Sequence, residues 1–364
     1  MKILTIVGAR PQFIKAAPVS KALREAGHPE YLVHTGQHYD YGMSQVFFDE
    51  LQIPEPDVNL AVGSASHGKQ TGQMLIRLEE VILEQQPDWL LVYGDTNSTL
   101  AGALVACKLQ IPIAHVEAGL RSFNRAMPEE HNRVLTDHCS ELLLCPTQTA
   151  VDNLAQEGIT AGVHLVGDRM YDAVLQFSEI ARQRRTILHQ LNVEPKKYLL
   201  ATVHRPYNTD VPDNIFSILT AFQEIGETII FPVHPRTRKQ ITLLDGMLDL
   251  PRLKHYVKMI EPVGYLDMLM LEQHARMILT DSGGIQKEAY FFGVPCVTLR
   301  PETEWVETVE AGWNVIVHAD REKIVAATTD RQWPRTSPPV IFGSGNASEQ
   351  IVHRLEAVGI GFAA

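Results

Sequence analysis

Cysteine is scarce in this sequence, and long apolar runs are absent. Its 364 residues include four cysteines, and no pair of them has the CxxC spacing of a redox motif or a zinc site. Cys107, Cys145 and Cys296 lie within apolar runs, so we expect them to be reduced core residues. No apolar stretch reaches membrane-spanning length. Met1–Gly8 has the pattern of a strand entering a turn, not of a signal segment, so we expect a cytoplasmic protein.

Positive charge is also deficient. The chain carries 32 Lys and Arg against 43 Asp and Glu, a net charge of -11, which argues against nucleic acid as a partner. A small anionic ligand remains compatible with this balance because it responds to local charge. None of the 15 histidines belongs to an HExxH or other metal-ligand spacing, so we expect no metal. GxGxxG followed by a ribose-binding acid is absent, as is GxxxxGK(S/T), which argues against a nicotinamide site and a P-loop.

Short apolar runs alternate with amphipathic segments along most of the chain. Repeated strand–helix units with strands rich in Val, Ile and Leu indicate parallel sheets covered on both faces. The predicted strands form two series: 2–7, 30–35, 89–93, 112–116, 142–145 and 163–166, then 198–203, 228–233, 254–260, 276–280 and 295–299. We predict an α/β protein with two doubly wound, Rossmann-like domains, residues 1–168 and 169–346. A last helix, 347–364, is expected to pack back on the first domain, with Ser348 as its N-cap.

Three carboxylates lie where the elements of the first series end or begin. Asp95 and Glu117 each follow a predicted strand closely, and Glu129 starts the next predicted helix. Ligands of open α/β sheets lie outside the carboxyl ends of the strands, so we expect these side chains to converge on one cleft. Grouped carboxylates raise one another's pKa and are costly unless they transfer protons. We therefore predict that these three perform acid–base catalysis.

The turn after the first strand has the chemistry of a phosphate site. Gly8 ends the strand and Arg10 begins the helix. The free N–H groups and positive dipole of a helix start suit an anion. Arg10 would add a bidentate contact, and Lys15 lies further along the helix. Most strand–glycine–helix turns are only turns, so this motif is weak by itself.

A second turn, Ser282-Gly283-Gly284, is a stronger signal. It follows the strand 276–280 and opens a helix, and its bare backbone N–H groups allow a diphosphate to approach closely. Glu288, one turn into that helix, could accept hydrogen bonds from ribose hydroxyls. A glycine-rich turn with a capping side chain explains the same residues equally well.

Two histidines follow strands of the second series. His204 directly follows the strand 198–203 and is predicted to bind phosphate or to donate a proton. A lone histidine at a strand end is more often structural. His234 repeats the position one strand later, which favours a functional role for both.

Together these motifs resemble the non-hydrolysing UDP-N-acetylglucosamine 2-epimerase family over essentially the whole chain. The matching pieces are Gly8–Pro11 with Lys15, Gly36–His38, Gly94–Thr96, His115–Arg121, Pro128–Arg133, His204–Arg205 and Asp281–Glu288. The resemblance implies a glycosyltransferase-B-like fold with the active site in the cleft between two domains. The implied catalytic residues are Asp95, Glu117, Glu129 and His204; the implied substrate contacts are Arg10, Lys15, Arg133, Ser282, Gly283, Gly284 and Glu288. His234 is predicted as a further substrate contact from its position after a strand, although a solvated basic turn explains residues 234–238 more simply.

The implied reaction is the reversible C2 epimerisation of UDP-N-acetylglucosamine to UDP-N-acetylmannosamine. UDP leaves by anti-elimination to give 2-acetamidoglucal and adds back syn, with a proton delivered to the other face of C2. Inversion needs acid–base groups on both faces of C2, which accounts for several carboxylates in one site. The reaction requires no cofactor, and the expected partner is a UDP-sugar.

Three motifs depart from the family pattern. Where the family usually has GTRPE, this sequence has GARPQ at Gly8–Gln12. The usual HRxE is HRPY at His204–Tyr207, and the usual TERPE is TEWVE at Thr303–Glu307. These variants are similar to those of a branch acting on UDP-2,3-diacetamido-glucuronate, which is therefore the first alternative substrate. A hydrolysing epimerase, a retaining glycosyltransferase and a nucleotide-sugar sensor are further alternatives. Three carboxylates would be surplus in a transferase or a sensor.

The resemblance also implies a homodimer and a role in polysaccharide biosynthesis. Bacterial members of the family bind a second, activating UDP-sugar near a Gln-His motif. This sequence retains Gln37-His38 from that neighbourhood, so activation stays an open alternative.

Overall fold

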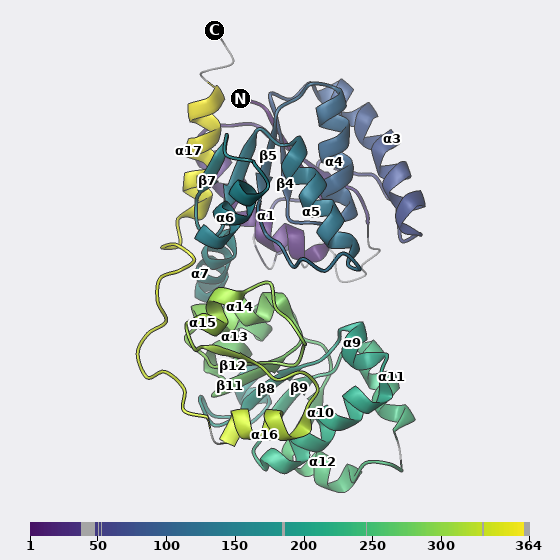
Figure 1. Ribbon diagram of the computed structural model, residues 1–364, viewed down its shortest axis with the longest axis vertical. Coiled ribbons are helices and arrows are strands. Elements are labelled where there is room, and N and C mark those ends of the chain that lie inside the picture. Colours follow the sequence, from purple (N-terminus) through teal and green to yellow (C-terminus); the bar gives the residue numbers. More distant parts are fainter. Residues whose placement is uncertain are drawn as a thin grey trace. The chain divides into compact units, whose positions relative to one another are not determined.

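The structure is a computed structural model (Figure 1). It describes residues 1–364 except 38–47, 50, 52, 184, 185, 245, 330 and 360–364, and it leaves out the side chains of 10, 11, 250 and 359. The chain forms two compact units. Unit 1 is Met1–Gln176 with Val340–Ala364, and unit 2 is Phe177–Pro339.

Unit 1 is built on a seven-stranded parallel sheet with the order β3-β2-β1-β4-β5-β6-β7. Its strands are β1 Ile3–Val7, β2 Glu30–His34, β3 Val58–Asn59, β4 Trp89–Tyr93, β5 Ile113–Val116, β6 Leu142–Cys145 and β7 Val163–Leu165. Residues of β1, β4 and β5 are buried along their whole length. Such strands are expected in a parallel sheet whose two faces are both covered by helices.

Helices cover the sheet of unit 1 (Figure 1). They are α1 Arg10–Glu25, α3 His67–Gln85, α4 Asn97–Lys108, α5 Pro128–Cys139, α6 Gln148–Gln156, the first half of α7 Arg169–Gln183, and α17 Ala347–Gly359. Close packing of α4 on the sheet depends on Gly102, because a Cβ there would lie 2.5 Å from Ile6 Cδ1. The last helix, α17, packs against α1.

Unit 2 repeats the plan with a six-stranded parallel sheet, order β10-β9-β8-β11-β12-β13. Its strands are β8 Leu199–Thr202, β9 Ile229–Pro232, β10 Val257–Ile260, β11 Met277–Thr280, β12 Cys296–Thr298 and β13 Asn314–Ile316. Its helices are the rest of α7, α8 Thr186–Gln190, α9 Pro206–Thr209, α10 Pro212–Ile225, α11 Pro235–Leu243, α12 Leu250–Tyr256, α13 Tyr265–His274, α14 Gly283–Phe291, α15 Val306–Glu310 and α16 Arg321–Thr329. One apolar core includes Phe222, Phe231 and Leu279.

The prediction of two parallel, Rossmann-like α/β sheets is confirmed. One predicted strand, 254–260, was too long, because its first three residues end the helix α12. Asp249 accepts a hydrogen bond from Arg252 N at 3.0 Å and caps that helix. Burial of Leu253 then ties the helix to the core. No helix among the described residues is long and apolar enough to cross a bilayer.

Two local predictions were wrong. Cys145 and Cys296 are buried, but Cys107 is exposed, because it lies on the outer face of α4 while Ala103 and Ala106 face inward. Ser348 does not cap the last helix, because it lies inside α17, one residue after its start. Asp172 of α7 takes the capping role by accepting hydrogen bonds from Ala347 N at 3.2 Å and Ser348 N at 2.6 Å.

This cap can be tested by substitution. Asp172→Ala leaves two buried N–H groups of α17 without their acceptor, so we expect the free energy of unfolding to fall by about 1–3 kcal/mol. Urea-induced unfolding followed by circular dichroism measures it. Glu349→Ala, an exposed change in the same turn, is the control and should change stability by less than about 0.5 kcal/mol. Equal stabilities of the two variants would contradict the capping role.

Candidate active site

The three predicted carboxylates gather at the carboxyl edge of the sheet of unit 1. Strands β4 and β5 are neighbours in register, Tyr93 opposite Val116. Asp95 and Glu117 therefore follow adjacent strand ends. The first turn of α5 supplies Glu129. Asp95 lies within electrostatic range of Lys15, Glu117 and Glu129, so the structure brings these four side chains together.

Glu117 is a nearly buried carboxylate held by two cations. It is 6% exposed. Its Oε2 lies 3.0 Å from Arg169 Nη2 and 3.3 Å from Lys15 Nζ. Its backbone φ is 72°, a left-handed conformation that costs a non-glycine residue about 1–3 kcal/mol. Gly94 forms a wall beside the carboxylate, because a Cβ there would lie 3.1 Å from Glu117 Oε2.

Asp95 has a different environment. Burial is the largest influence and raises its pKa above the usual value, although 33% of its side chain is accessible. The charges of Arg133 and Lys15 oppose this increase in the pKa, and those of Glu117 and Glu129 add to it. Arg133 Nη2 lies 2.5 Å from Asp95 Oδ2. Arg133 thus contacts a carboxylate of the cluster, and the cluster contains one carboxyl group whose protonated form is favoured.

A buried ionic network lies beneath the cluster. Asp137 Oδ1 is 2.7 Å from His115 Nδ1, and Asp137 Oδ2 is 2.7 Å from Arg121 Nη1. The Nε2 atom of His115 is 2.8 Å from the carbonyl oxygen of Gly94. A carbonyl and a carboxylate both accept hydrogen bonds, so both ring nitrogens donate. The network therefore fixes the turn that lies between β4 and Asp95.

The turn after β1 is fixed by Gln12. Its Oε1 accepts a hydrogen bond from Gly8 N at 2.7 Å, and its Nε2 donates to the carbonyl oxygen of Tyr93 at 2.8 Å. A glutamate could not donate the second bond in its ionised form. Arg10 begins α1, but its side chain lies outside the described part of the chain, as does all of His38.

In unit 2, Asp281 organises the strand ends that carry His204. The buried carboxylate of Asp281 accepts hydrogen bonds from the backbone N–H groups of His204 and Arg205, and from Asn208 Nδ2 at 3.0 Å. The His204 and His234 rings are 6.0 Å apart. Burial lowers the pKa of His204; the charges of Arg205, His234 and Arg236 lower it further, whereas Asp281 opposes them. The neutral imidazole is therefore favoured.

The predicted diphosphate turn opens α14. Ser282 is the N-cap residue of this helix, and its side chain makes no capping hydrogen bond, so the hydroxyl does not satisfy the first N–H groups. At Gly283 a Cβ would lie 3.4 Å from Glu304 Oε2, whereas at Gly284 the surroundings are more open. Glu288 is buried one turn later and accepts a hydrogen bond from Tyr265 Oη at 2.9 Å. Ser282, Gly283, Gly284 and Glu288 thus share one helix start.

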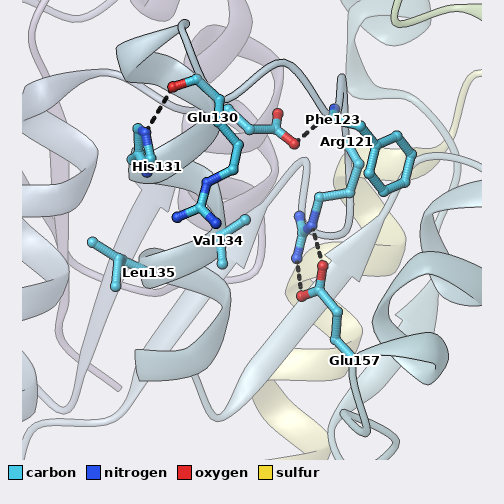
Figure 2. A pocket seen from close by; sticks show the side chains of 8 residues that line it. Arg121, Phe123, Glu130, His131, Val134, Leu135 and Glu157 are labelled. Carbon is cyan, nitrogen blue, oxygen red and sulfur yellow. Dashed lines mark hydrogen bonds and ion pairs between the residues drawn. The ribbon is translucent and has the colours of Figure 1, made fainter.

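A separate pocket of unit 1 has a volume of about 390 Å³ (Figure 2). It is lined by Arg121, Phe123, Arg125, Glu130, His131, Val134, Leu135 and Glu157. Several of its charged groups are already engaged: Arg121 pairs with Glu157, and Glu130 accepts a hydrogen bond from Phe123 N at 2.9 Å (Figure 2). The three predicted carboxylates do not line this pocket, so it is distinct from their cluster.

Sequence reasoning missed the side chains that support Glu117. Arg121 belongs to the family motif His115–Arg121, but no pattern in the neighbouring sequence indicates its ion pair with Asp137. Arg169 lies four residues after β7 and belongs to no motif that the sequence analysis identified. Among the described residues, no group of three or more His, Cys, Asp or Glu side chains is arranged to hold a metal ion.

Two parallel Rossmann-like sheets with polar side chains at their carboxyl edges define a protein of the glycosyltransferase-B-like class. The family model described as UDP-N-acetylglucosamine 2-epimerase matches residues 21–356, and the chain belongs to that family. The predicted family and the prediction of an epimerase are thereby confirmed.

Three relatives place the chain within the family. A protein of Methanococcus maripaludis named UDP-N-acetylglucosamine 2-epimerase homolog is 56% identical, covering 98% of this chain and 99% of the relative. The UDP-2,3-diacetamido-2,3-dideoxy-D-glucuronate 2-epimerase of Pseudomonas aeruginosa is 50% identical with the same coverage. The crystal structure of Methanocaldococcus jannaschii UDP-GlcNAc 2-epimerase in complex with UDP-GlcNAc and UDP is 45% identical, with a TM-score of 0.87 over 98% of this chain and 100% of that one.

We predict that the ionic network of His115, Asp137 and Arg121 stabilises the folded protein strongly, and that this stabilisation depends on pH. Burial would raise the pKa of Asp137, but His115 and Arg121 outweigh burial, and its pKa lies below the usual value. Its contribution to stability is therefore present above the unfolded-state pKa of about 3.9 and is lost as the pH falls below it. Asp137→Asn leaves buried cations without their carboxylate, so we expect a loss of about 3–5 kcal/mol at pH 7.

Urea-induced unfolding at pH 7 and at a series of lower pH values measures this loss. Asp152→Asn serves as the control, because it removes an exposed carboxylate of α6 that accepts a hydrogen bond from Gln148 Nε2 at 2.9 Å. A change within about 0.5 kcal/mol of wild type for Asp137→Asn would refute the prediction.

Proposed function

We propose that this protein catalyses the reversible C2 epimerisation of UDP-N-acetylglucosamine to UDP-N-acetylmannosamine. One observation carries the proposal: two carboxylates at one sheet edge lie in opposite environments. Glu117 lies between two cations that favour its ionised form, whereas burial raises the pKa of Asp95. Titratable groups whose environments differ in this way supply a base and an acid within one site.

In the proposed elimination, the Glu117 carboxylate takes the proton from C2. The C2–H electron pair forms the C1–C2 double bond. The C1–O bond breaks anti to the C2–H bond, and UDP leaves with the electron pair of the C1–O bond. The product is 2-acetamidoglucal. In the return step a UDP oxygen attacks C1, and Asp95 or Glu129 delivers a proton syn to the opposite face of C2. Proton exchange with solvent resets the carboxyl groups. Each positioned acid or base contributes roughly 10²–10⁴-fold to the rate.

The remaining predicted residues are assigned to binding. The start of α14, with Ser282, Gly283 and Gly284, would stabilise the departing diphosphate, and Glu288 would accept from the ribose. Arg10 is retained as a diphosphate contact on the family resemblance alone.

The basic side chains and the two histidines are assigned different roles. Lys15 and Arg133 contact the carboxylates of the cluster, which supports roles beside the sugar. His204, favoured in its neutral form, would donate a hydrogen bond to the diphosphate rather than a full charge, and His234 lies next to it.

Proton NMR in D₂O with UDP-N-acetylglucosamine tests the reaction. We expect signals of UDP-N-acetylmannosamine and loss of the H2 signal as deuterium enters C2, because the proton leaves and returns from solvent. Free N-acetylmannosamine with UDP would instead establish a hydrolysing enzyme. An unchanged spectrum would rule out this substrate.

The role of Glu117 is tested by Glu117→Gln. The amide keeps the shape but cannot accept the C2 proton, so we expect turnover to fall about 10²–10⁴-fold. Affinity for UDP, measured by calorimetry, should stay near wild type, because the proposed diphosphate contacts come from other residues. Glu349→Gln, at an exposed position of α17, is the control. Near-wild-type turnover would remove Glu117 from the mechanism.

A second candidate substrate is UDP-2,3-diacetamido-2,3-dideoxy-glucuronate. The observation in its favour is that the relative named for this sugar is 50% identical to the chain, against 46% for the Methanocaldococcus jannaschii UDP-N-acetylglucosamine 2-epimerase. The same exchange experiment with this sugar decides between them. A homodimer and a role in polysaccharide biosynthesis stay predictions from the family resemblance.

A further inference from the structure

Arg169 is a buried cation beside the proposed base. It is the first residue of α7 and is 1% exposed. Its Nη2 lies 3.0 Å from Glu117 Oε2, and its guanidinium carbon lies 5.2 Å from the centre of the Tyr93 ring. We propose that Arg169 is a positioning residue for the reaction, holding the Glu117 carboxylate in its ionised form and in one orientation. This inference rests on the proposed function.

The guanidinium is costly where it lies. Its Nε, Nη1 and Nη2 atoms are buried and make no hydrogen bond to the described residues. Burying a charge without hydrogen bonds opposes folding. The attractions that the structure gives it are the charge of Glu117 and the face of the Tyr93 ring. An apolar side chain would fill the same space at lower cost, so a purely structural role does not account for an arginine here.

Lys15 cannot replace Arg169 in this role. Its side chain is 27% exposed, and its Nζ lies 3.3 Å and 3.5 Å from the two oxygens of Glu117. It stands on α1, one and a half turns after the turn proposed to bind phosphate. A flexible, partly exposed lysine can turn toward an anionic substrate. Arg169 is 1% exposed and stays beside Glu117, so it continues to compensate the charge of Glu117 when Lys15 turns toward the substrate.

The chain fixes Arg169 at its position. Gly167 has a φ of 86°, and Asp168 N donates to the carbonyl oxygen of Phe342 at 2.9 Å. Asp168 Oδ1 accepts a hydrogen bond from Met170 N at 2.7 Å. These bonds set the start of α7, so the arginine enters the cluster from a rigid turn.

Three titratable groups lie near Glu117 and come from three elements: Lys15 on α1, Arg169 on α7, and Asp95 after β4. Removal of Arg169 takes away the buried cation that lies 3.0 Å from Glu117 Oε2. The ionised form of Glu117 then loses support. Because the proposed base must be ionised, the acid limb of the pH–rate profile should move to higher pH.

Arg169→Met tests the proposal by removing the charge while retaining much of the side-chain volume. We expect kcat to fall about 10- to 100-fold, because the base is misplaced and less often ionised. KM for the UDP-sugar should change little, and the acid limb should move to higher pH. Arg169→Lys should recover part of kcat and of the pH profile. The control is Arg182→Met, a half-exposed arginine of the same helix that pairs with Glu179.

A wild-type kcat and pH profile in Arg169→Met would overturn the proposal, as would a rise in KM with kcat unchanged. If Arg169→Met does not fold, Arg169→Gln, which also removes the charge, takes its place in both measurements. The double variant with Glu117→Gln gives a second check. Residual turnover should not fall further when Arg169 is changed in that background, and a full additional loss would mean that Arg169 acts independently of Glu117.

If the wild-type protein exchanges no C2 hydrogen, the proposed function is refuted. The role of Arg169 is then tested by a measurement that does not depend on turnover. Carbon-13 NMR of glutamate-labelled protein follows the Glu117 carboxylate, assigned by its absence in Glu117→Gln. A titration midpoint at higher pH in Arg169→Met than in wild type supports the charge-holding role, and an unchanged midpoint overturns it.

Discussion

The carboxyl edge of the sheet of unit 1 holds one nearly buried carboxylate beside two cations. Glu117 directly follows β5, and the cations that lie beside it come from α1 and α7, which are far apart in the sequence. Removing a carboxylate from water costs several kcal/mol unless it is paired. The parallel order β1-β4-β5 brings the end of β5 close to the start of α1, and the turn before α7 supplies the second cation. The order of the strands therefore determines which cations can reach Glu117.

The layer beneath the carboxylates is polar rather than apolar. His115, Asp137 and Arg121 fix the turn after β4 through hydrogen bonds, and Gln12 joins that turn to the end of β1. Hydrogen bonds restrict the conformation of a turn more than apolar packing does, because each bond is strong only over a narrow range of distances and angles. The glutamine of the variant GARPQ motif is explained in the same way, since it must donate to a carbonyl oxygen as well as accept from an N–H group.

The sheets, and the carboxylates at their edge, were predictable because a parallel strand is a local pattern and its carboxyl end is a known ligand position. The partners of those carboxylates were not. Arg169 and Asp137 acquire their roles from contacts with distant segments, and nothing in the neighbouring residues indicates them. The errors at Cys107 and Ser348 have a related cause: apolar runs and capping residues are local signals, whereas the face that a residue presents and the acceptor that caps a helix are set by packing.

The proposed reaction requires unit 2 to bind an anion close to acidic side chains. Its proposed site holds Glu288, whose carboxylate accepts from Tyr265, and Glu272 lies fully buried nearby. Burial, followed by the charge of Glu288, raises the pKa of Glu272 well above its usual value. A protonated Glu272 adds no negative charge beside α14, whereas an ionised one would oppose a diphosphate at the start of that helix. The burial of Glu272 therefore favours the proposed binding of an anion there.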